Sequence, residues 1–316
     1  MAEPFLRLDT ISKAYDQHQA VDRVSLSIPR GSIYGLLGPN GAGKTSIIRM
    51  ITGITAPDTG QIWFDGEPLR REHTHLTGYM PEERGLYKKM KIREQAIYLL
   101  VLKGMREQDA ARAADRWLDR LGLGEWKNRN TTDLSKGMQQ KVQFIITVAH
   151  EPRLLILDEP FSGLDPVNAR LIEDEIRALQ RQGTTILFST HRLEQVEEFC
   201  DHIALINQGK VMLENDIVTV RKQFQKNEYF LEYEGDAAAL DQLAGYTIEH
   251  TKPGAALITP PEGQDGKALL RLLIESPLGI QRFEQHLPRL NDIFIELVGG
   301  ATRVGMQQAP SLAPKA

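Results

Sequence analysis

The chain of 316 residues lacks several features that mark whole classes of protein. Its single cysteine, Cys200, excludes an internal disulfide framework and is compatible with a reducing compartment. No apolar run approaches the roughly 18 residues that a membrane-spanning helix needs, and residues 1–4 lack the basic and apolar regions of a secretion signal. The net charge of -4 gives no basic signature for nucleic acid. With 41% hydrophobic and 25% charged residues the composition is globular, so a role at a membrane requires a partner.

The most informative segment that is present reads GPNGAGKT at residues 38–45. A strand-like apolar run at 33–37 precedes it, and a helix-like run at 46–51 follows it. In this order glycines let backbone N–H groups point at phosphate oxygens, and the positive helix end faces the same anion. We predict that Lys44 reaches the β- and γ-phosphates of ATP and that the Thr45 hydroxyl binds Mg²⁺. A glycine-rich turn that matches by chance is the alternative, which the full pattern in this context disfavours. The predicted ATP-binding residues here are Gly38, Pro39, Asn40, Gly41, Ala42, Gly43, Lys44, Thr45 and Ser46.

A second apolar run, at residues 154–157, ends in Asp158 and Glu159. An acid at the carboxyl end of a strand in an α/β sheet projects into the ligand crevice. Asp158 is therefore predicted to hold Mg²⁺, directly or through water, and Glu159 to orient or deprotonate the attacking water. Two solvated loop charges would be the alternative.

Two further motifs, LSKGM at residues 134–138 and STH at residues 189–191, complete a set of four. Over roughly residues 4–215 this set resembles the ATP-binding subunits of ABC transporters. The resemblance implies an α/β phosphate-loop ATPase core with a parallel sheet, an antiparallel β subdomain and a helical subdomain at about 90–150. It also implies ATP and Mg²⁺ as cofactors, ATP hydrolysis as the activity, and a nucleotide-sandwich dimer.

The LSKGM segment is the most diagnostic part of the resemblance. From the residues alone, Ser135 is a predicted N-cap of a helix at 137–149, and Gly137 permits close approach to an N–H at that helix end. Without the other motifs Ser135 would be a helix cap and nothing more. The resemblance implies that Ser135, Lys136, Gly137 and Met138 bind the γ-phosphate of ATP held by the opposite subunit. Lys136 and Met138 depart from the glycine and glutamine of the family's LSGGQ signature.

The resemblance assigns roles to two further single residues. His191 matches the switch histidine that contacts the γ-phosphate, and it joins Lys44 and Glu159 as a predicted catalytic residue. Tyr15 matches the aromatic residue that stacks on adenine, for which a ring face is a suitable platform. Taken alone, a histidine at a strand end is more often structural, and a tyrosine there is often only half-buried.

Glu82 departs from the family, which commonly has glutamine at this position. Its carboxylate can offer oxygen to ATP-bound Mg²⁺ and water, but it adds negative charge near Asp158 and Glu159. A solvated loop acid without a part in the chemistry is the alternative, and the sequence leaves both open. The surrounding PEERGLY segment, followed by the lysine-rich residues 88–91, resembles the branch of exporter ATPases associated with sodium or drug export.

The ATPase motifs stop at about residue 215. Strand-like runs at 228–234 and 255–259 and a helix-like run at 267–276 predict a small α+β accessory domain over 216–300. It is similar to the C-terminal extension of that exporter branch, and dimer contact, regulation and a purely structural role all stay open. Residues 301–316, rich in Ala, Pro and Gln, are predicted to be a flexible tail.

We therefore expect an ATP-hydrolysing, energy-coupling subunit of an ABC transporter, by resemblance an exporter, bound peripherally at the cytoplasmic face of the cell membrane. Its expected partners are a second copy or a homologous ATPase subunit, and an integral-membrane transport subunit that contacts residues 87–97; no nucleic acid is expected. The alternative is a soluble ABC ATPase acting on ribosomes or DNA, but the paired cassettes, coiled coils or zinc sites usual there do not appear. A regulatory module that does not hydrolyse ATP is disfavoured by Lys44, Asp158 and Glu159. The sequence does not specify the transported substrate.

Overall fold

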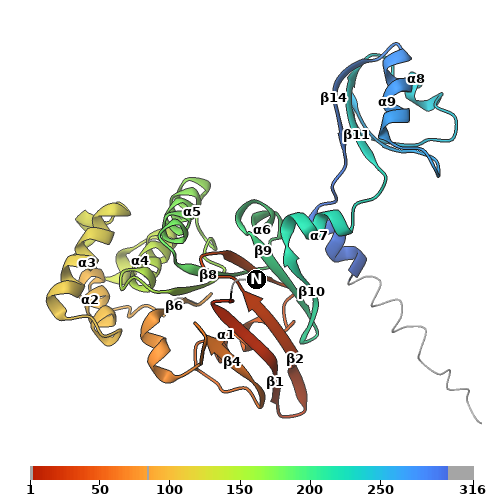
Figure 1. Ribbon diagram of the computed structural model, residues 1–316. Helices are drawn as coiled ribbons and strands as arrows, with labels where there is room; N and C mark the ends of the chain where they lie inside the picture. The colour runs from red at the N-terminus through yellow and green to blue at the C-terminus, as the bar shows by residue number, and fades with distance from the viewer. Residues whose placement is uncertain (1–2, 84, 298–316) are drawn as a thin grey trace, which may run out of the picture. The chain divides into compact units, whose positions relative to one another are not determined.

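The computed structural model describes residues 3–83 and 85–297. The chain divides into two compact units, residues 1–217 and 218–316 (Figure 1). The sequence had placed the end of the ATPase domain at about 215, and the expected tail at 301–316 lies outside the described residues.

A six-stranded sheet of order β10-β9-β3-β8-β7-β6 forms the centre of the first unit. The strands are β3 (Ile33–Leu37), β6 (Thr77–Met80), β7 (Leu154–Asp158), β8 (Thr185–Thr190), β9 (His202–Asn207) and β10 (Lys210–Asp216). They pair in parallel from β9 to β6, and β10 is antiparallel to β9. β3, β7 and β8 are buried along their whole length, which explains why they read as continuous apolar runs. The carboxyl ends of β3 and β7 consequently lie on either side of β8.

A four-stranded antiparallel sheet of order β2-β1-β4-β5 packs against this centre. Its strands are β1 (Leu6–Tyr15), β2 (His18–Ile28), β4 (Thr59–Phe64) and β5 (Glu67–Pro68). The buried residues of helix α1 (Lys44–Ile51) belong to one hydrophobic core with apolar side chains of both sheets. The predicted parallel sheet with an antiparallel β subdomain is confirmed.

Helices α2 (Ile92–Leu102), α3 (Glu107–Arg120) and α4 (Lys136–Val148) form the helical part of this unit (Figure 1). The apolar face of α3 contacts α4, where Trp117 and Phe144 meet edge to face with ring centroids 6.2 Å apart. α3 begins at Glu107, and the acidic residues Glu107 and Asp109 in its first turn suit the positive end of a helix. The remaining helical segments of this unit are η1 (Arg71–Leu76), η2 (Gly124–Trp126), η3 (Thr131–Asp133), α5 (Pro166–Arg181) and α6 (Leu193–Phe199). Helix α7 (Ile217–Gln223) begins at the last residue of the first unit and otherwise belongs to the second.

The second unit is an α+β domain with a sheet of order β12-β13-β11-β14. Its elements are β11 (Tyr229–Glu234), α8 (Ala238–Asp241), β12 (Thr247–Lys252), β13 (Ala255–Thr259), α9 (Gly266–Glu275), β14 (Gly279–Gln285) and a helix over 290–297. One sheet face and both named helices enclose a separate hydrophobic core. The strands β12 and β14 were not predicted, because both lie at sheet edges and are mostly exposed and polar.

Candidate active site

The loop at residues 38–43 has a backbone that favours glycine. Gly38, Gly41 and Gly43 have φ values of 150°, 78° and 108°. A Cβ on Gly38 would lie 2.2 Å from a backbone carbonyl oxygen, and one on Gly43 would lie 2.4 Å from another. Helix α1 follows at once, and no side chain caps its first turn. The first N–H groups of α1 are therefore left for an anion at the loop.

Lys44 turns back onto this loop. Its Nζ donates to the carbonyl oxygens of Gly38 at 2.7 Å and Pro39 at 3.1 Å. Burial lowers the pKa of Lys44, and neighbouring carboxylates, Asp158 first among them, oppose that shift. The ammonium thus stands beside the loop within reach of several negative charges.

Asp158 ends β7 as a buried carboxylate, with 7% of the residue exposed. Burial raises the pKa of Asp158, and the negative charges of Glu82 and Glu159 raise it further, whereas Lys44 lowers it. Buried, mutually repelling carboxylates favour a bound cation, and hard oxygen ligands suit Mg²⁺.

Glu159 follows β7 in the left-handed backbone region, with φ of 50°. Residues at and just after the end of β8 contact both of its carboxylate oxygens. Oε1 accepts from the His191 backbone N at 2.8 Å and lies 2.6 Å from His191 Nδ1. Oε2 accepts from Thr190 Oγ1 at 3.1 Å, and that hydroxyl in turn accepts from the backbone N of Arg192 at 3.1 Å. The direction of the Glu159 carboxylate is therefore set by the STH segment.

A single cavity of 290 Å³, the phosphate-loop cavity, brings most predicted site residues together. It is lined by Tyr15, His18, Ala20, Asn40, Gly41, Ala42, Gly43, Lys44, Thr45, Ser46, Glu82, Asp158, Glu159 and His191. Gly38 and Pro39 do not line it but hold Lys44 through their carbonyl groups. Glu82 lines the cavity although its side chain is exposed. Residues from β1, α1, β7 and β8 thus converge where an anion site and a carboxylate cluster meet.

Comparison with known proteins gives matches over nearly the whole chain. A family model for the ABC transporter matches residues 21–162, and one for the ATP-binding protein DrrA1-3-like, C-terminal domain, matches residues 216–298. The chain is 40% identical over 295 residues to the uncharacterized ABC transporter ATP-binding protein YhaQ of Bacillus subtilis (strain 168), covering 93% of this chain and 98% of YhaQ. It is 30% identical over 304 residues to the bacitracin transport ATP-binding protein BcrA of Bacillus licheniformis, covering 94% of this chain and 98% of BcrA.

Solved structures give the same result. A structure of the ATP-binding subunit of an ABC transporter matches with a TM-score of 0.65 at 30% identity, over 70% of this chain and 93% of that chain. The dimeric ATP-binding cassette MJ0796, bound to ADP and Pi in a post-hydrolysis state, matches with a TM-score of 0.62 at 22% identity, over 67% of this chain and 98% of that chain.

This chain belongs to the ABC transporter ATP-binding proteins. As an ABC ATPase it binds nucleotide and hydrolyses ATP as the energy-coupling subunit of a transporter. The predicted family, activity and core fold are thereby confirmed. The relatives are transport proteins by name, which favours transport over the ribosome or DNA alternative.

The LSKGM segment at residues 134–138, called the signature segment below, does not line the phosphate-loop cavity of this ABC ATPase. Ser135 is the N-cap of α4, and its Oγ accepts from the backbone N of Met138 at 3.2 Å. Ser135 and Lys136 are exposed, while Gly137 and Met138 are half-buried. The segment is therefore accessible at the surface of this protomer.

Three residues of the ABC ATPase site escaped the sequence interpretation. Thr190 binds Glu159, and its position inside the STH motif was the available signal. His18 and Ala20 line the cavity from the start of β2, and only their closeness in sequence to Tyr15 pointed there. Across residues 3–83 and 85–297, no helix of this ABC ATPase is long and apolar enough to cross a membrane.

Proposed function

We propose that this ABC ATPase binds Mg-ATP in two sites that are shared between two ATPase subunits, and that hydrolysis drives export through a separate membrane subunit. One observation carries the proposal: the phosphate loop, the acids and His191 line one cavity, whereas the signature segment is exposed elsewhere. A twofold-related second subunit would supply Ser135 and Gly137 to that cavity. The dimeric state of the MJ0796 cassette supports this arrangement.

The residues present fit ATP. Gly38 and Gly43 form a cradle in which a Cβ would collide with backbone oxygens, and the first turn of α1 has no side-chain cap. Phosphate oxygens would accept hydrogen bonds from the backbone N–H groups of that turn, and Lys44 would contact the β- and γ-phosphates. Tyr15 lines the same cavity and would offer its ring to adenine.

The residues also fit Mg²⁺. Thr45, Asp158 and Glu82 line the cavity and are the side chains that would hold the ion. Burial, and after it the negative charges of Glu82 and Glu159, raises the pKa of Asp158, and a bound cation would oppose that shift. When bound, Mg²⁺ neutralises charge that develops on the phosphate oxygens.

Glu159 is the group that would orient or deprotonate the attacking water. His191 and Thr190 fix the direction of its carboxylate, so the base is positioned before reaction rather than during it. His191 lines the cavity with a side chain that is 56% exposed, and it would contact the γ-phosphate from there.

Mixed dimers test the shared site. A Lys44→Ala subunit combined with a Ser135→Arg subunit gives one site that carries both changes and one that carries neither. We expect the verified mixed dimer to recover part of the ATPase activity that each parent lacks. A mixed dimer as inactive as both parents would contradict independent shared sites.

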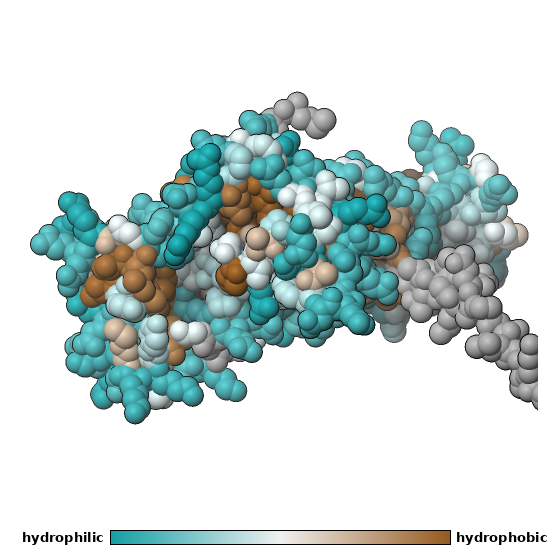
Figure 2. All heavy atoms as spheres, turned by 90° about the horizontal axis from the view of Figure 1, so that it is seen from below, coloured by the Kyte–Doolittle hydropathy of each residue, from teal (hydrophilic) through white to brown (hydrophobic). Residues whose placement is uncertain are grey.

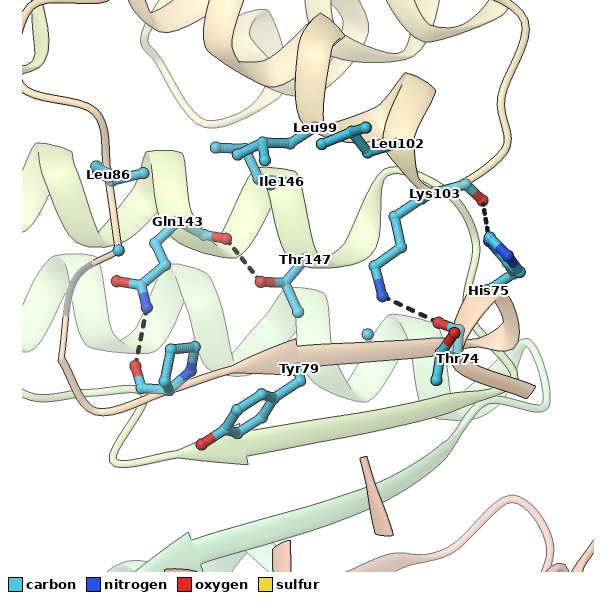
Figure 3. A pocket seen from close by; sticks show the side chains of 13 residues that line it. Thr74, His75, Tyr79, Leu86, Leu99, Leu102, Lys103, Gln143, Ile146 and Thr147 are labelled. Atoms are coloured by element: carbon cyan, nitrogen blue, oxygen red, sulfur yellow. Dashed lines mark hydrogen bonds between the residues drawn. The ribbon is translucent and has the colours of Figure 1, made fainter. Parts of the chain in front are cut away.

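The membrane subunit would dock in a second hollow, the α2–α4 groove, which has a volume of 480 Å³. Leu99 and Leu102 of α2, Ile146 of α4 and Leu86 lie around it, whereas the ring of Tyr79 on β6 points away from them (Figure 3). The nearby side chains of Tyr98 and Val101 are also exposed, and apolar surface shows at the end of the molecule that carries α2 (Figure 2). Contiguous exposed apolar surface of this kind marks an interaction site.

An amide side chain in the lining of the groove is buried. Gln143 is 5% exposed, and its Nε2 donates to the carbonyl oxygen of Pro81 at 2.8 Å (Figure 3). Its Oε1 is buried without a hydrogen-bond partner among the described residues. The apolar residues around it favour a short apolar helix as the docked segment. Docking there would hold the ATPase peripherally at the cytoplasmic face of the membrane.

The lysines next to the groove provide the test of docking. Charge reversal of Lys88, Lys89 and Lys91, all exposed, should weaken association with membranes that contain the transport subunit, while ATP affinity stays unchanged. Copurification of that subunit from native membranes would identify it. Recovery of the wild-type chain entirely in the soluble fraction, with the membrane subunit coexpressed, would favour a soluble ATPase instead.

A further inference from the structure

Tyr15 stands at the end of β1, and that strand end is fastened by a residue from elsewhere. Asp58 lies in the loop between α1 and β4 and contacts three consecutive residues before Tyr15. Its backbone N donates to the Ser12 carbonyl oxygen at 2.8 Å. Its Oδ2 accepts from the Ala14 backbone N at 2.8 Å, and its Oδ1 accepts from Lys13 Nζ at 2.6 Å.

Lys13 carries this contact on to the tyrosine ring. Its Nζ lies 5.8 Å from the centroid of the Tyr15 ring, within the range of a cation–π interaction. The Lys13 side chain is only 17% exposed, so its ammonium is confined between Asp58 and the ring. The hydrogen bond from Lys13, followed by that from Ala14, lowers the pKa of Asp58, which keeps the carboxylate ionised at neutral pH.

The β ladder around this point is irregular. The pairing of β1 with β2 shifts register on both sides of Lys13, and its pairing with β4 shifts between Asp9 and Ser12. Regular strand pairing therefore fixes this stretch poorly, and bulged stretches commonly re-aim a side chain. The contacts of Asp58 supply the constraint that the ladder lacks.

We propose that Asp58 is a positioning residue for adenine, which aims the Tyr15 ring through Lys13 and the backbone of residues 12–14. The proposal rests on the adenine-stacking role proposed above for Tyr15. Helix α1 has the phosphate loop at its start, and the loop from its end leads to Asp58. Asp58 thus ties the element that binds the phosphates to the platform that binds the base.

The experiment compares ligands with and without a base, on the full-length chain. Binding of ATP, ADP and inorganic tripolyphosphate is measured by calorimetry for wild type, Asp58→Ala and Tyr15→Ala. Loss of base stacking on one aromatic ring weakens binding about ten- to a hundredfold, which we expect for Tyr15→Ala with ATP and ADP. Asp58→Ala should weaken both nucleotides about five- to tenfold and leave tripolyphosphate unchanged.

Further variants separate positioning from general stability. Lys13→Met breaks the same chain of contacts at its other end and should weaken ATP but not tripolyphosphate, even if Asp58→Ala folds poorly. Asp109→Ala is the matched control, because Asp109 pairs with Arg106 and Arg112 around the start of α3 and does not line the cavity. In the Tyr15→Ala chain, Asp58→Ala should weaken ATP no further.

Each outcome decides one proposal. If Asp58→Ala weakens tripolyphosphate as much as ATP, or keeps its full effect without Tyr15, Asp58 is merely structural and the inference is overturned. If Tyr15→Ala weakens ATP but both Asp58→Ala and Lys13→Met do not, the inference alone fails. If Tyr15→Ala leaves ATP affinity intact, the proposed stacking role fails, and the inference with it.

Discussion

In the phosphate-loop cavity, backbone conformation and buried charge govern the chemistry, whereas in the α2–α4 groove apolar side chains line the surface. Residues close in sequence line the two hollows: Tyr79 and Pro81 line the groove, and Glu82 lines the cavity. In the cavity a glycine or a carboxylate cannot be exchanged without losing an N–H cradle or a charge. In the groove the binding energy of a docked partner would be spread over an apolar area, so many residues of similar size would serve.

The cavity should be the less tolerant of the two, and Glu159→Gln gives the largest expected effect. The amide keeps the shape of the side chain but removes the basic oxygen, so hydrolysis should fall by a factor on the order of 10² or more while ATP still binds. Steady-state turnover and nucleotide affinity measure the two separately. Glu83→Gln is the matched control, since Glu83 is an exposed acid outside the cavity lining. Near-normal turnover of Glu159→Gln would remove Glu159 from the catalytic role.

The groove should show the opposite pattern, with binding lost and basal chemistry kept. Leu102 lines the groove and is 58% exposed, so Leu102→Glu should place a charge against the docked partner at little cost to the fold. We expect about tenfold weaker association with the membrane subunit and unchanged basal ATPase activity. Cosedimentation with partner-containing membranes measures the association. Ile54→Glu, at a residue 59% exposed outside the groove lining, is the control. Equal loss in both variants would show a nonspecific effect of charge and exclude the groove as the docking site.

The same difference explains what the sequence could predict. The loop at 38–45, Asp158 and Glu159 follow buried apolar strands, and a short motif after such a strand reports local geometry directly. The groove has no such signal, because its lining comes from α2, α4, β6 and η1 and forms only after those elements pack. The hydrogen bond from Thr190 and the contacts of Asp58 likewise depend on tertiary packing. Asp58 is 45 positions from Lys13 in sequence, and no local pattern joins them.

In the C-terminal unit the helix predicted at 267–276 is present as α9, and among the strands only the buried ones were predicted. β11 and β13 have alternating or continuous burial and were predicted, whereas the mostly exposed edge strands β12 and β14 carry no apolar period. The role of this unit stays open between dimer contact, regulation and structure.

A smaller effect should come from Thr190, which holds Glu159 without touching nucleotide in our proposal. Thr190→Val removes the hydroxyl that donates to Glu159 Oε2, and His191 still holds the other oxygen. We expect kcat to fall about fivefold with little change in KM, because a hydrogen bond to a charged group is worth about 1.5–3 kcal/mol and part of the restraint remains. Thr190→Ser keeps the hydroxyl and should restore turnover. A Ser variant as slow as the Val variant would assign the loss to packing.

The smallest effect tests whether the cavity bears a stability cost for its function. Asp158 is buried and its pKa is raised, first by burial and then by neighbouring carboxylates. An acid with a raised pKa in the folded state contributes its full share to stability below the unfolded-state pKa of about 3.8. That contribution is lost as the pH rises through the folded-state pKa. Asp158→Asn should therefore raise the Tm of the nucleotide-free chain at pH 7.5 by a few degrees, since about 1 kcal/mol corresponds to about 2–4 °C in a domain of this size. The gain in Tm should shrink as the pH falls toward 4. Asp158→Asn also removes a negative charge next to Lys44, which works against the gain.

Asp109, an exposed acid whose pKa is lowered by Arg112 and Arg106, is the control at which Asn should give no gain. Thermal unfolding of both variants across this pH range measures the difference, and a Tm for Asp158→Asn below wild type at pH 7.5 would show that the buried carboxylate stabilises the fold instead.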